Sequence, residues 1–195
     1  VDAQFFKPDG EAYDPDTLSF IGRMDYYPNQ ECMFEFCRNT FPLIRERRPQ
    51  AKLLIVGADP SPAVRKLAER PGVTVTGFVP DVRPYILRSA AMVAPLNIAR
   101  GTQNKILEAM AMGVPVVTSP AGAGGVDAED EAHFLVGREP TDYARACLRL
   151  MNDPAERQRL ATAGRQRVLS HHDWQASMLR LDAIVAQLLP GGNVV

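Results

Sequence analysis

Short apolar runs alternate with longer amphipathic stretches along most of the chain. Many of the runs end at a glycine or a polar residue, as the buried strands of a parallel sheet do. The runs predict strands at 18–24, 52–57, 73–79, 91–95, 114–118 and 132–136. Helical periodicity predicts helices at 29–47, 62–69, 82–89, 103–112, 141–151, 154–170 and 173–189. This alternation indicates an α/β fold, a single doubly wound parallel sheet of about six strands with helices on both faces.

The same pattern divides the chain into three segments. Residues 1–17 are rich in Asp, Pro and Gly and are expected to form an irregular lead-in or linker. Residues 18–170 contain the predicted sheet and its helices. Residues 171–195 are expected to form a final helix, with Asp173 as its N-cap, and a tail. Trp174 is expected to pack in the core or against a further domain.

The composition excludes several classes of function. The 195 residues have a net charge of −1, which gives no electrostatic basis for binding nucleic acid or an anionic membrane. No run approaches the ~20 apolar residues of a membrane span. The start is polar and unlike a signal peptide, and the three cysteines lack a disulfide-type spacing. We therefore expect a cytoplasmic protein with its cysteines in the core, and no metal because no acidic cluster has ligand spacing.

The segment between the fourth and fifth predicted strands carries the strongest functional pattern. A polar loop with Gly101 leads into a helix that begins near Gln103 and ends at Gly113. A helix that begins at the carboxyl end of a buried parallel strand directs its free N–H groups and partial positive charge at the crevice above the sheet. The backbone from Thr102 to Lys105 is therefore expected to hold a phosphate.

Glu108 lies one turn into this helix, and two interpretations of it remain open. It is three residues from Lys105, so the two side chains could form a salt bridge on a solvated face. Alternatively, the carboxylate could bind the hydroxyl groups of a ligand held at the end of the helix.

The run NKILEAMAMGVPVVTSPAGAGG resembles the nucleotide-sugar-binding motif of retaining glycosyltransferases with the two-domain GT-B fold, of the group 1 or family 4 type. In that family a glutamate precedes an Ala-Met-Ala-x-Gly-x-Pro-Val-Val string. The resemblance extends over residues 20–174 and implies the Rossmann-like, C-terminal half that binds the donor. The implied activity is transfer of a sugar from a nucleotide diphosphate sugar, with retained anomeric configuration, as in a hexosyltransferase.

The resemblance also implies roles for individual residues. Glu108 matches the glutamate that grips the ribose of the donor, and Arg23 matches the arginine that pairs with the diphosphate. The family often has a second basic residue near Asn29, and Lys105 is placed to supply that charge from the other side. The family's sugar-contacting glutamate falls on Arg100, so the donor sugar stays undetermined. The expected catalytic residues are Arg23, Lys105 and Glu108, and the expected donor-binding residues are Gly22, Gly57, Phe78, Val79, Gly101, Thr102, Gln103 and Asn104.

The implied partners are a nucleotide sugar and a glycan or lipid-linked acceptor, and no cofactor is implied. The opening VDAQFFKPD resembles the segment that enters the second domain, so we expect an inactive fragment whose acceptor-binding N-terminal domain is missing. Its source would be a bacterial enzyme of polysaccharide biosynthesis, with peripheral membrane association of the full-length protein left open. The final helix should expose Leu181, Ile184 and Leu188, which a dimer of the fragment could cover.

Three other functions use similar patterns. A non-catalytic nucleotide-sugar-binding module or a sugar-nucleotide epimerase would have the same motifs. A nicotinamide-dependent dehydrogenase would need Gly-x-Gly-x-x-Gly at the start of a long helix. The glycine-rich run at 121–125 misplaces the third glycine, so we expect a flexible loop there.

Overall fold

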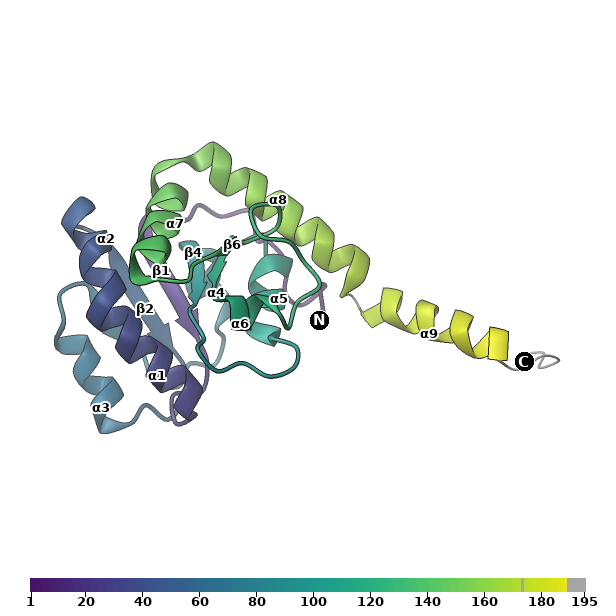
Figure 1. Ribbon diagram of the computed structural model, residues 1–195, viewed down its shortest axis with the longest axis horizontal. Helices are drawn as coiled ribbons and strands as arrows, with labels where there is room; N and C mark the ends of the chain where they lie inside the picture. Colours follow the sequence, from purple (N-terminus) through teal and green to yellow (C-terminus); the bar gives the residue numbers. More distant parts are fainter. Residues whose placement is uncertain (173, 189–195) are drawn as a thin grey trace.

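The computed structural model describes residues 1–172 and 174–188 (Figure 1). Its centre is a parallel sheet of six strands in the order β3-β2-β1-β4-β5-β6, which confirms the predicted doubly wound architecture. The strands are β1 Asp14–Ile21, β2 Lys52–Val56, β3 Val73–Val75, β4 Ser89–Ala94, β5 Val116–Thr118 and β6 Leu135–Val136.

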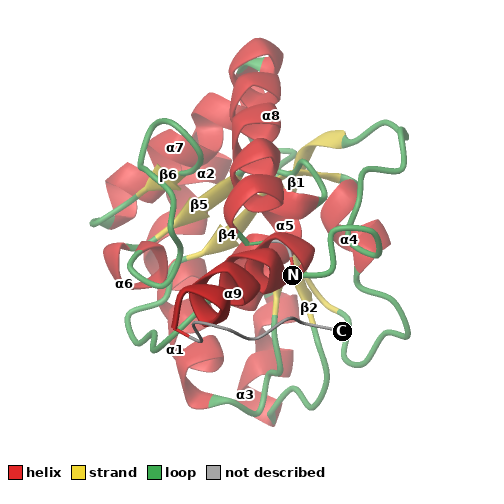
Figure 2. Ribbon diagram, turned by 90° about the vertical axis from the view of Figure 1, so that its right-hand side faces the viewer, coloured by secondary structure: helices red, strands yellow, loops and turns green. Residues whose placement is uncertain are grey.

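Helices cover both faces of the sheet (Figure 1, Figure 2). One face packs against α1 Tyr27–Glu35, α2 Phe41–Arg47, α3 Pro62–Arg65 and α7 Pro140–Asn152. The other packs against α4 Arg83–Leu87, α5 Asn104–Ala111 and α8 Pro154–His171. The remaining helices are α6 Pro120–Ala123, which follows β5, and α9 Trp174–Leu188, which extends away from the body of the molecule.

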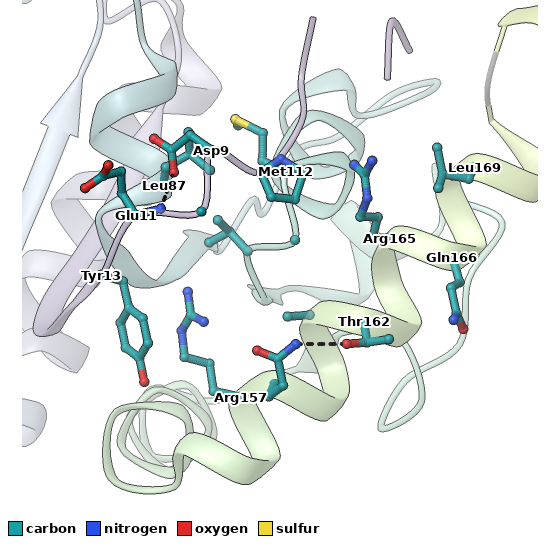
Figure 3. A pocket seen from close by; sticks show the side chains of 16 residues that line it. Asp9, Glu11, Tyr13, Leu87, Met112, Arg157, Thr162, Arg165, Gln166 and Leu169 are labelled. Carbon is teal, nitrogen blue, oxygen red and sulfur yellow. Dashed lines mark hydrogen bonds between the residues drawn. The ribbon is translucent and has the colours of Figure 1, made fainter. Parts of the chain in front are cut away.

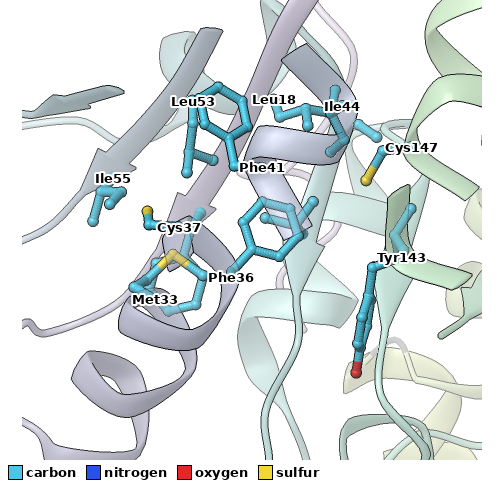
Figure 4. Close-up of a cluster of buried hydrophobic side chains, with 14 of the residues drawn as sticks. Leu18, Met33, Phe36, Cys37, Phe41, Ile44, Leu53, Ile55, Tyr143 and Cys147 are labelled. Atoms are coloured by element: carbon cyan, nitrogen blue, oxygen red, sulfur yellow. The ribbon is translucent and has the colours of Figure 1, made fainter. Parts of the chain in front are cut away.

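Side chains of β1 contribute to both hydrophobic cores, one on each face of the sheet. Leu18 lies in the cluster beneath α1, α2 and α7 (Figure 4). Phe20 belongs to the same cluster, and Ile21 belongs to the cluster on the opposite face. All three cysteines are buried, as predicted. Burial raises the pKa of Cys32 and that of Cys37 to about 12, so both remain uncharged core side chains at neutral pH.

The predicted helix 29–47 is interrupted by one turn of π-helix over Phe36–Thr40. Pro42 explains this difference, because it has no N–H to bond to the preceding turn and its ring displaces the chain. The N–H of Phe41 bonds instead to the carbonyl of Phe36. The guanidinium of Arg70 donates to the carbonyl of Cys37 at 3.0 Å, which satisfies an acceptor in the widened turn.

Other boundaries also differ from the prediction. β1 begins at Asp14, inside the segment expected to be irregular, and β3 ends at Val75 because Gly77 follows with a φ of 73°. The expectation of a flexible glycine-rich loop is wrong. The side chain of Ser119 accepts a hydrogen bond from Gly122 N–H and caps the short helix α6, in which Gly122 is buried.

The final helix exposes much of its apolar surface. Trp174 is 65% exposed, so the core position considered for it is wrong. Leu181 and Ile184 are exposed, as expected, whereas Asp173 and the side chain of Leu188 lie outside the described residues. None of the described helices is both long and apolar enough to cross a membrane.

A glycine follows each of β1 and β2 at a crowded edge of the sheet. A Cβ atom on Gly57, whose φ is +156°, would lie 1.8 Å from the carbonyl oxygen of Gly22. A Cβ atom on Gly22 would lie 2.6 Å from the side-chain amide of Asn29. The sequence places a glycine at each position, and backbone therefore lines this edge of the sheet.

We expect Gly57→Ala to lower the free energy of unfolding by ~3 kcal/mol or more, since the new methyl group meets rigid backbone. Denaturant titration measures the loss. Gly77→Ala is the matched control, because Gly77 also has a positive φ but nothing within 4 Å of its Cβ position. Equal losses for the two variants would mean that the close approach to Gly22 has no energetic consequence.

Candidate functional site

The N-terminus of α5 meets the carboxyl end of β1 at one edge of the sheet. Gly22, Asn29 and Lys105 come together there from three different elements. The Cβ position of Gly22 lies 3.1 Å from Nζ of Lys105, so the absence of a side chain on Gly22 leaves room for the ammonium group. No side chain caps the N-terminus of α5. Its first N–H groups are therefore available to a ligand.

Lys105 is a largely buried cation with a neutral partner. Its Nζ donates to Oδ1 of Asn29 at 2.6 Å and lies 4.6 Å from the ring centroid of Phe20. It forms no ion pair with a carboxylate of any described residue. Burial lowers its pKa to about 8, against a smaller opposing effect from Glu108. A desolvated cation without a counter-ion favours an incoming anion.

Asn29 fixes the position of this ammonium group. The residue is buried near the start of α1, and its Nδ2 donates to the carbonyl of Arg23 at 2.8 Å. That bond leaves Oδ1 as the acceptor for Lys105. The amide thus connects the loop after β1 to the first turn of α5.

Glu108 is half-buried and accepts no hydrogen bond from the side chains or backbone of the described residues. The salt bridge with Lys105 that the sequence allowed is not formed. Burial raises the pKa of the Glu108 carboxyl, and the charges of Lys105 and the Val1 amino group oppose that shift. The carboxylate is therefore free to accept hydrogen bonds from a ligand.

Arg23 lies at the same edge but is already held by two carboxylates. Its guanidinium donates to both oxygens of Asp25, at 3.1 and 2.7 Å, and to Asp59 at 3.0 Å. The hydrogen bond from Arg23 lowers the pKa of Asp25. The side chain is 68% exposed, so it can exchange these partners for a ligand at little cost.

The remaining predicted residues line the loops above the sheet. Phe78 is 77% exposed and Val79 is half-buried, just beyond β3. Gly101 has a φ of 63°, and its carbonyl lies 2.2 Å from the Cβ position of Gly125. The glycine-rich segment therefore packs directly on the loop before α5. Thr102 and Asn104 are exposed, and Gln103 donates to the carbonyls of Arg100 and Gly101.

Sequence reasoning missed a polar pair beside this edge. Nδ2 of Asn97, just after β4, donates to Glu31 in α1 at 2.7 Å. The other carboxylate oxygen of Glu31 is buried without a partner among the described residues. A cavity of about 180 Å³ lies next to this pair, lined in part by Asn97, Cys32 and Arg138. The only sequence signal was the place of Asn97 directly after a buried strand.

The described residues contain no group of three or more His, Cys, Asp or Glu side chains that could hold a metal ion. The positive groups at the site are instead Lys105, Arg23 and the N-terminus of α5.

We expect Lys105 to impose a pH dependence on stability. Between its folded pKa of about 8 and the ordinary value of 10.5, the unfolded chain holds more protons than the folded chain. This residue therefore makes the free energy of unfolding rise with pH, by at most ~1.4 kcal/mol per pH unit. Denaturant titrations of wild type and Lys105→Met from pH 7 to 10 isolate the effect, because other groups cancel in the difference. A constant difference across that range would show an unshifted lysine.

This chain is similar to part of the length of two curated relatives. A glycosyltransferase 1 domain-containing protein 1 from Xenopus tropicalis is 27% identical over 156 residues, 76% of this chain and 45% of the relative. An MMP alpha-(1->4)-mannosyltransferase from Mycolicibacterium hassiacum is 30% identical over 141 residues, 68% of this chain and 34% of the relative. The chain thus spans less than half the length of either relative.

Solved structures share the fold. The C-terminal domain of a group 1 glycosyl transferase, LpcC, from Francisella tularensis has a TM-score of 0.72 at 18% identity, over 90% of this chain and 100% of that domain. Anabaena HepE, solved with UDP and glucose, has a TM-score of 0.71 at 15% identity, over 97% of this chain and 55% of HepE. The sheet is thus the Rossmann-like half of the GT-B architecture. The family model for glycosyl transferases group 1 matches residues 15–153, more than half of the chain, and the chain belongs to this family.

Proposed function

We propose that this chain is the donor-binding half of a retaining glycosyltransferase and that it binds a nucleotide diphosphate sugar at the carboxyl edge of its sheet. The observation that carries the proposal is Lys105, a largely buried cation without an acidic partner at the N-terminus of α5. Glu108, a carboxylate without a donor from the described residues, lies one turn further along the same helix. A phosphate bound to Lys105 would neutralise its charge, and a ribose bound to Glu108 would supply hydrogen-bond donors to its carboxylate.

The diphosphate would lie between α5 and the loop after β1. The backbone N–H groups at the start of α5 and the ammonium of Lys105 are fixed in place before the reaction. When the bond between sugar and phosphate breaks, negative charge grows on the leaving diphosphate, and fixed donors stabilise it without reorganisation. Arg23 would join them by exchanging Asp25 and Asp59 for phosphate oxygens. This arrangement requires neither a metal nor a cofactor.

The rest of the donor would follow from this placement. Glu108 would accept hydrogen bonds from the ribose hydroxyl groups, and the backbone of Phe78 and Val79 would receive the base. Gly22, Gly57 and the loop from Gly101 to Asn104 would allow the backbone to approach the phosphates. The structure of HepE with UDP and glucose, and the name of the mannosyltransferase relative, are consistent with a hexose donor. Arg100 stands where the family places its sugar-contacting glutamate, so we propose no particular sugar.

The acceptor would be a glycan or a lipid-linked sugar held by a second domain. Two observations support such a domain: the curated relatives are more than twice as long as the part matched here, and α9 exposes Leu181 and Ile184. A bacterial, cytoplasmic enzyme of polysaccharide synthesis, with peripheral membrane association of the full-length protein, fits this acceptor class. The exposed face of α9 would also allow the isolated chain to dimerise.

The proposal predicts that two variants both weaken the binding of UDP but differ in their effect on the binding of uridine. Glu108→Gln should weaken UDP and uridine alike, about tenfold or more, because a carboxylate bonded to hydroxyl groups contributes ~1.5–3 kcal/mol. Lys105→Met should weaken UDP by a similar factor and leave uridine unchanged, since only the diphosphate carries charge. If uridine and UDP do not bind the wild-type protein, the same comparison is made with guanosine and GDP and with adenosine and ADP. Calorimetry measures each dissociation constant.

The exposed residues Glu46 and Lys66 provide matched controls. Glu46→Gln and Lys66→Met remove the same charges far from the proposed site and should leave both affinities unchanged. Equal loss of nucleoside and diphosphate in Lys105→Met would place Lys105 away from the phosphates. Unchanged affinity in Glu108→Gln would exclude the ribose contact.

We further expect the isolated 195-residue chain to bind the donor without transferring sugar. Transfer in a two-domain enzyme takes place in the cleft between domains, where closure excludes water and positions the acceptor. The assay compares this chain with the full-length protein, using radiolabelled donors and lipid-linked or sugar acceptors. Turnover by the chain alone at the full-length rate would contradict the two-domain mechanism. Donor conversion without an acceptor would favour the epimerase alternative.

A further inference from the structure

A cavity of about 470 Å³ lies at the amino edge of the sheet, opposite the proposed donor site (Figure 3). It is bounded by the lead-in from Pro8 to Tyr13, by the end of α5 at Met112 and Gly113, and by one face of α8. The lining residues of α8 recur at helical spacing and form a single stripe: Arg157, Gln158, Ala161, Thr162, Arg165, Gln166 and Leu169.

Arg157 is a buried cation in the wall of this cavity. Its side chain is only 7% exposed, and its guanidinium lies 3.5 Å from the ring centroid of Tyr13 (Figure 3). It donates to the carbonyls of Ala90 and Ser89, at 2.9 and 3.1 Å, and forms no ion pair with a described carboxylate. Two backbone carbonyls use only part of its five N–H donors. The ring of Tyr13 and the two carbonyls stabilise the charge, but no carboxylate of the described residues neutralises it.

Arg165 brings a second guanidinium to the same cavity, two turns further along α8. It is half-buried, donates to the carbonyl of Ala111, and has no ion pair among the described residues. The carboxylate of Asp9 is neutralised by Arg88 at 2.8 Å, which leaves Glu11 as the one lining acid without an ion pair in the described part of the chain. The cavity thus carries a net positive charge.

The other polar side chains in the cavity carry amide, hydroxyl and carboxylate groups. Gln158 donates to Oγ1 of Thr162 at 3.1 Å, and Gln166 and Thr162 present exposed polar atoms along the same face (Figure 3). Glu11 can accept hydrogen bonds from hydroxyl groups at the rim. The guanidinium of Arg165 suits a phosphate, and the amide, hydroxyl and carboxylate groups beside it suit a polyol, which together define one chemical class of ligand.

We propose that this cavity is a second ligand site, which binds a small phosphorylated sugar with its phosphate at Arg165, and that the ligand modulates the donor site through α5. The coupling follows from the position of the helix. Arg165 bonds to Ala111 at the C-terminus of α5, and Lys105 occupies its first turn. A phosphate that draws Arg165 away from Ala111 removes a contact that fixes this short helix. The coupling, but not the binding, rests on the proposed function.

Ribose 5-phosphate is the probe, with ribose and inorganic phosphate as its two halves. We expect saturable binding of ribose 5-phosphate in calorimetry, weaker binding of phosphate and none of ribose. Arg165→Gln should weaken ribose 5-phosphate at least tenfold, whereas Arg38→Gln, which removes an exposed arginine elsewhere, should not. Arg157 is left intact because it also joins α8 to β4, so its loss could unfold the protein.

Lys105→Met decides which site is occupied. Retained binding of ribose 5-phosphate in this variant supports the amino-edge cavity, and binding lost in Lys105→Met but kept in Arg165→Gln would overturn the proposal. Absence of saturable binding up to 10 mM, in a protein whose fold is verified by circular dichroism, would also overturn it. Equal affinity for phosphate and ribose 5-phosphate would refute the recognition of the sugar.

A second titration tests the coupling. The dissociation constant of UDP should change about fivefold or more when ribose 5-phosphate is saturating, and that of ribose 5-phosphate should change by the same factor in saturating UDP. Unchanged values would refute the coupling through α5. If none of UDP, GDP and ADP binds, the proposed function fails, while the direct titrations with ribose 5-phosphate still decide whether the cavity is a ligand site.

Discussion

The close approach of backbone to backbone at the carboxyl end of β1 is the constraint on which the candidate site depends. Gly57 lies against the carbonyl of Gly22, and Gly22 in turn leaves room for Asn29 and Lys105. A side chain at either glycine would push apart the two strand ends or fill the space that the ammonium group occupies. The core beneath can tolerate some exchange of apolar residues, but at this edge there is no room for an added side chain.

The two basic side chains near this edge are held by opposite means. Lys105 is desolvated and fixed by a neutral amide, and no carboxylate of the described residues pairs with it. Arg23 is solvated and satisfied by two carboxylates. The first residue is prepared for an anion, whereas the second must change partners to reach one. An anion at this edge would therefore meet a preorganised group first and a mobile group second.

Much of the fold could be predicted from the sequence because apolar runs, glycine stops and helical periods all indicate the same elements. The misses have local causes: Pro42 widened a helix that the apolar pattern shows as continuous, and Ser119 capped a short helix in a run that composition alone marks as a loop. The contact between Asn29 and Lys105 joins residues 76 positions apart, and the sequence suggested it only through the family resemblance, in which Lys105 supplies the charge expected near Asn29. The pairing of Arg23 with acids from two loops left no pattern in the sequence, because it depends on how exposed loops fold back.

The ion pairs of Arg23 have a consequence for selectivity. Asp25 and Asp59 act as internal competitors, so any anion that recruits the guanidinium must first displace them. A pyrophosphate offers several charged oxygens at once, and a chloride or a lone carboxylate offers fewer, so the exchange favours the diphosphate. The same carboxylates would reclaim the arginine when a cleaved diphosphate begins to leave, which lowers the barrier to its departure. On the proposed function, Asp25 and Asp59 would weaken the binding of the donor. In return they would favour a diphosphate over smaller anions and speed the release of the nucleoside diphosphate after transfer.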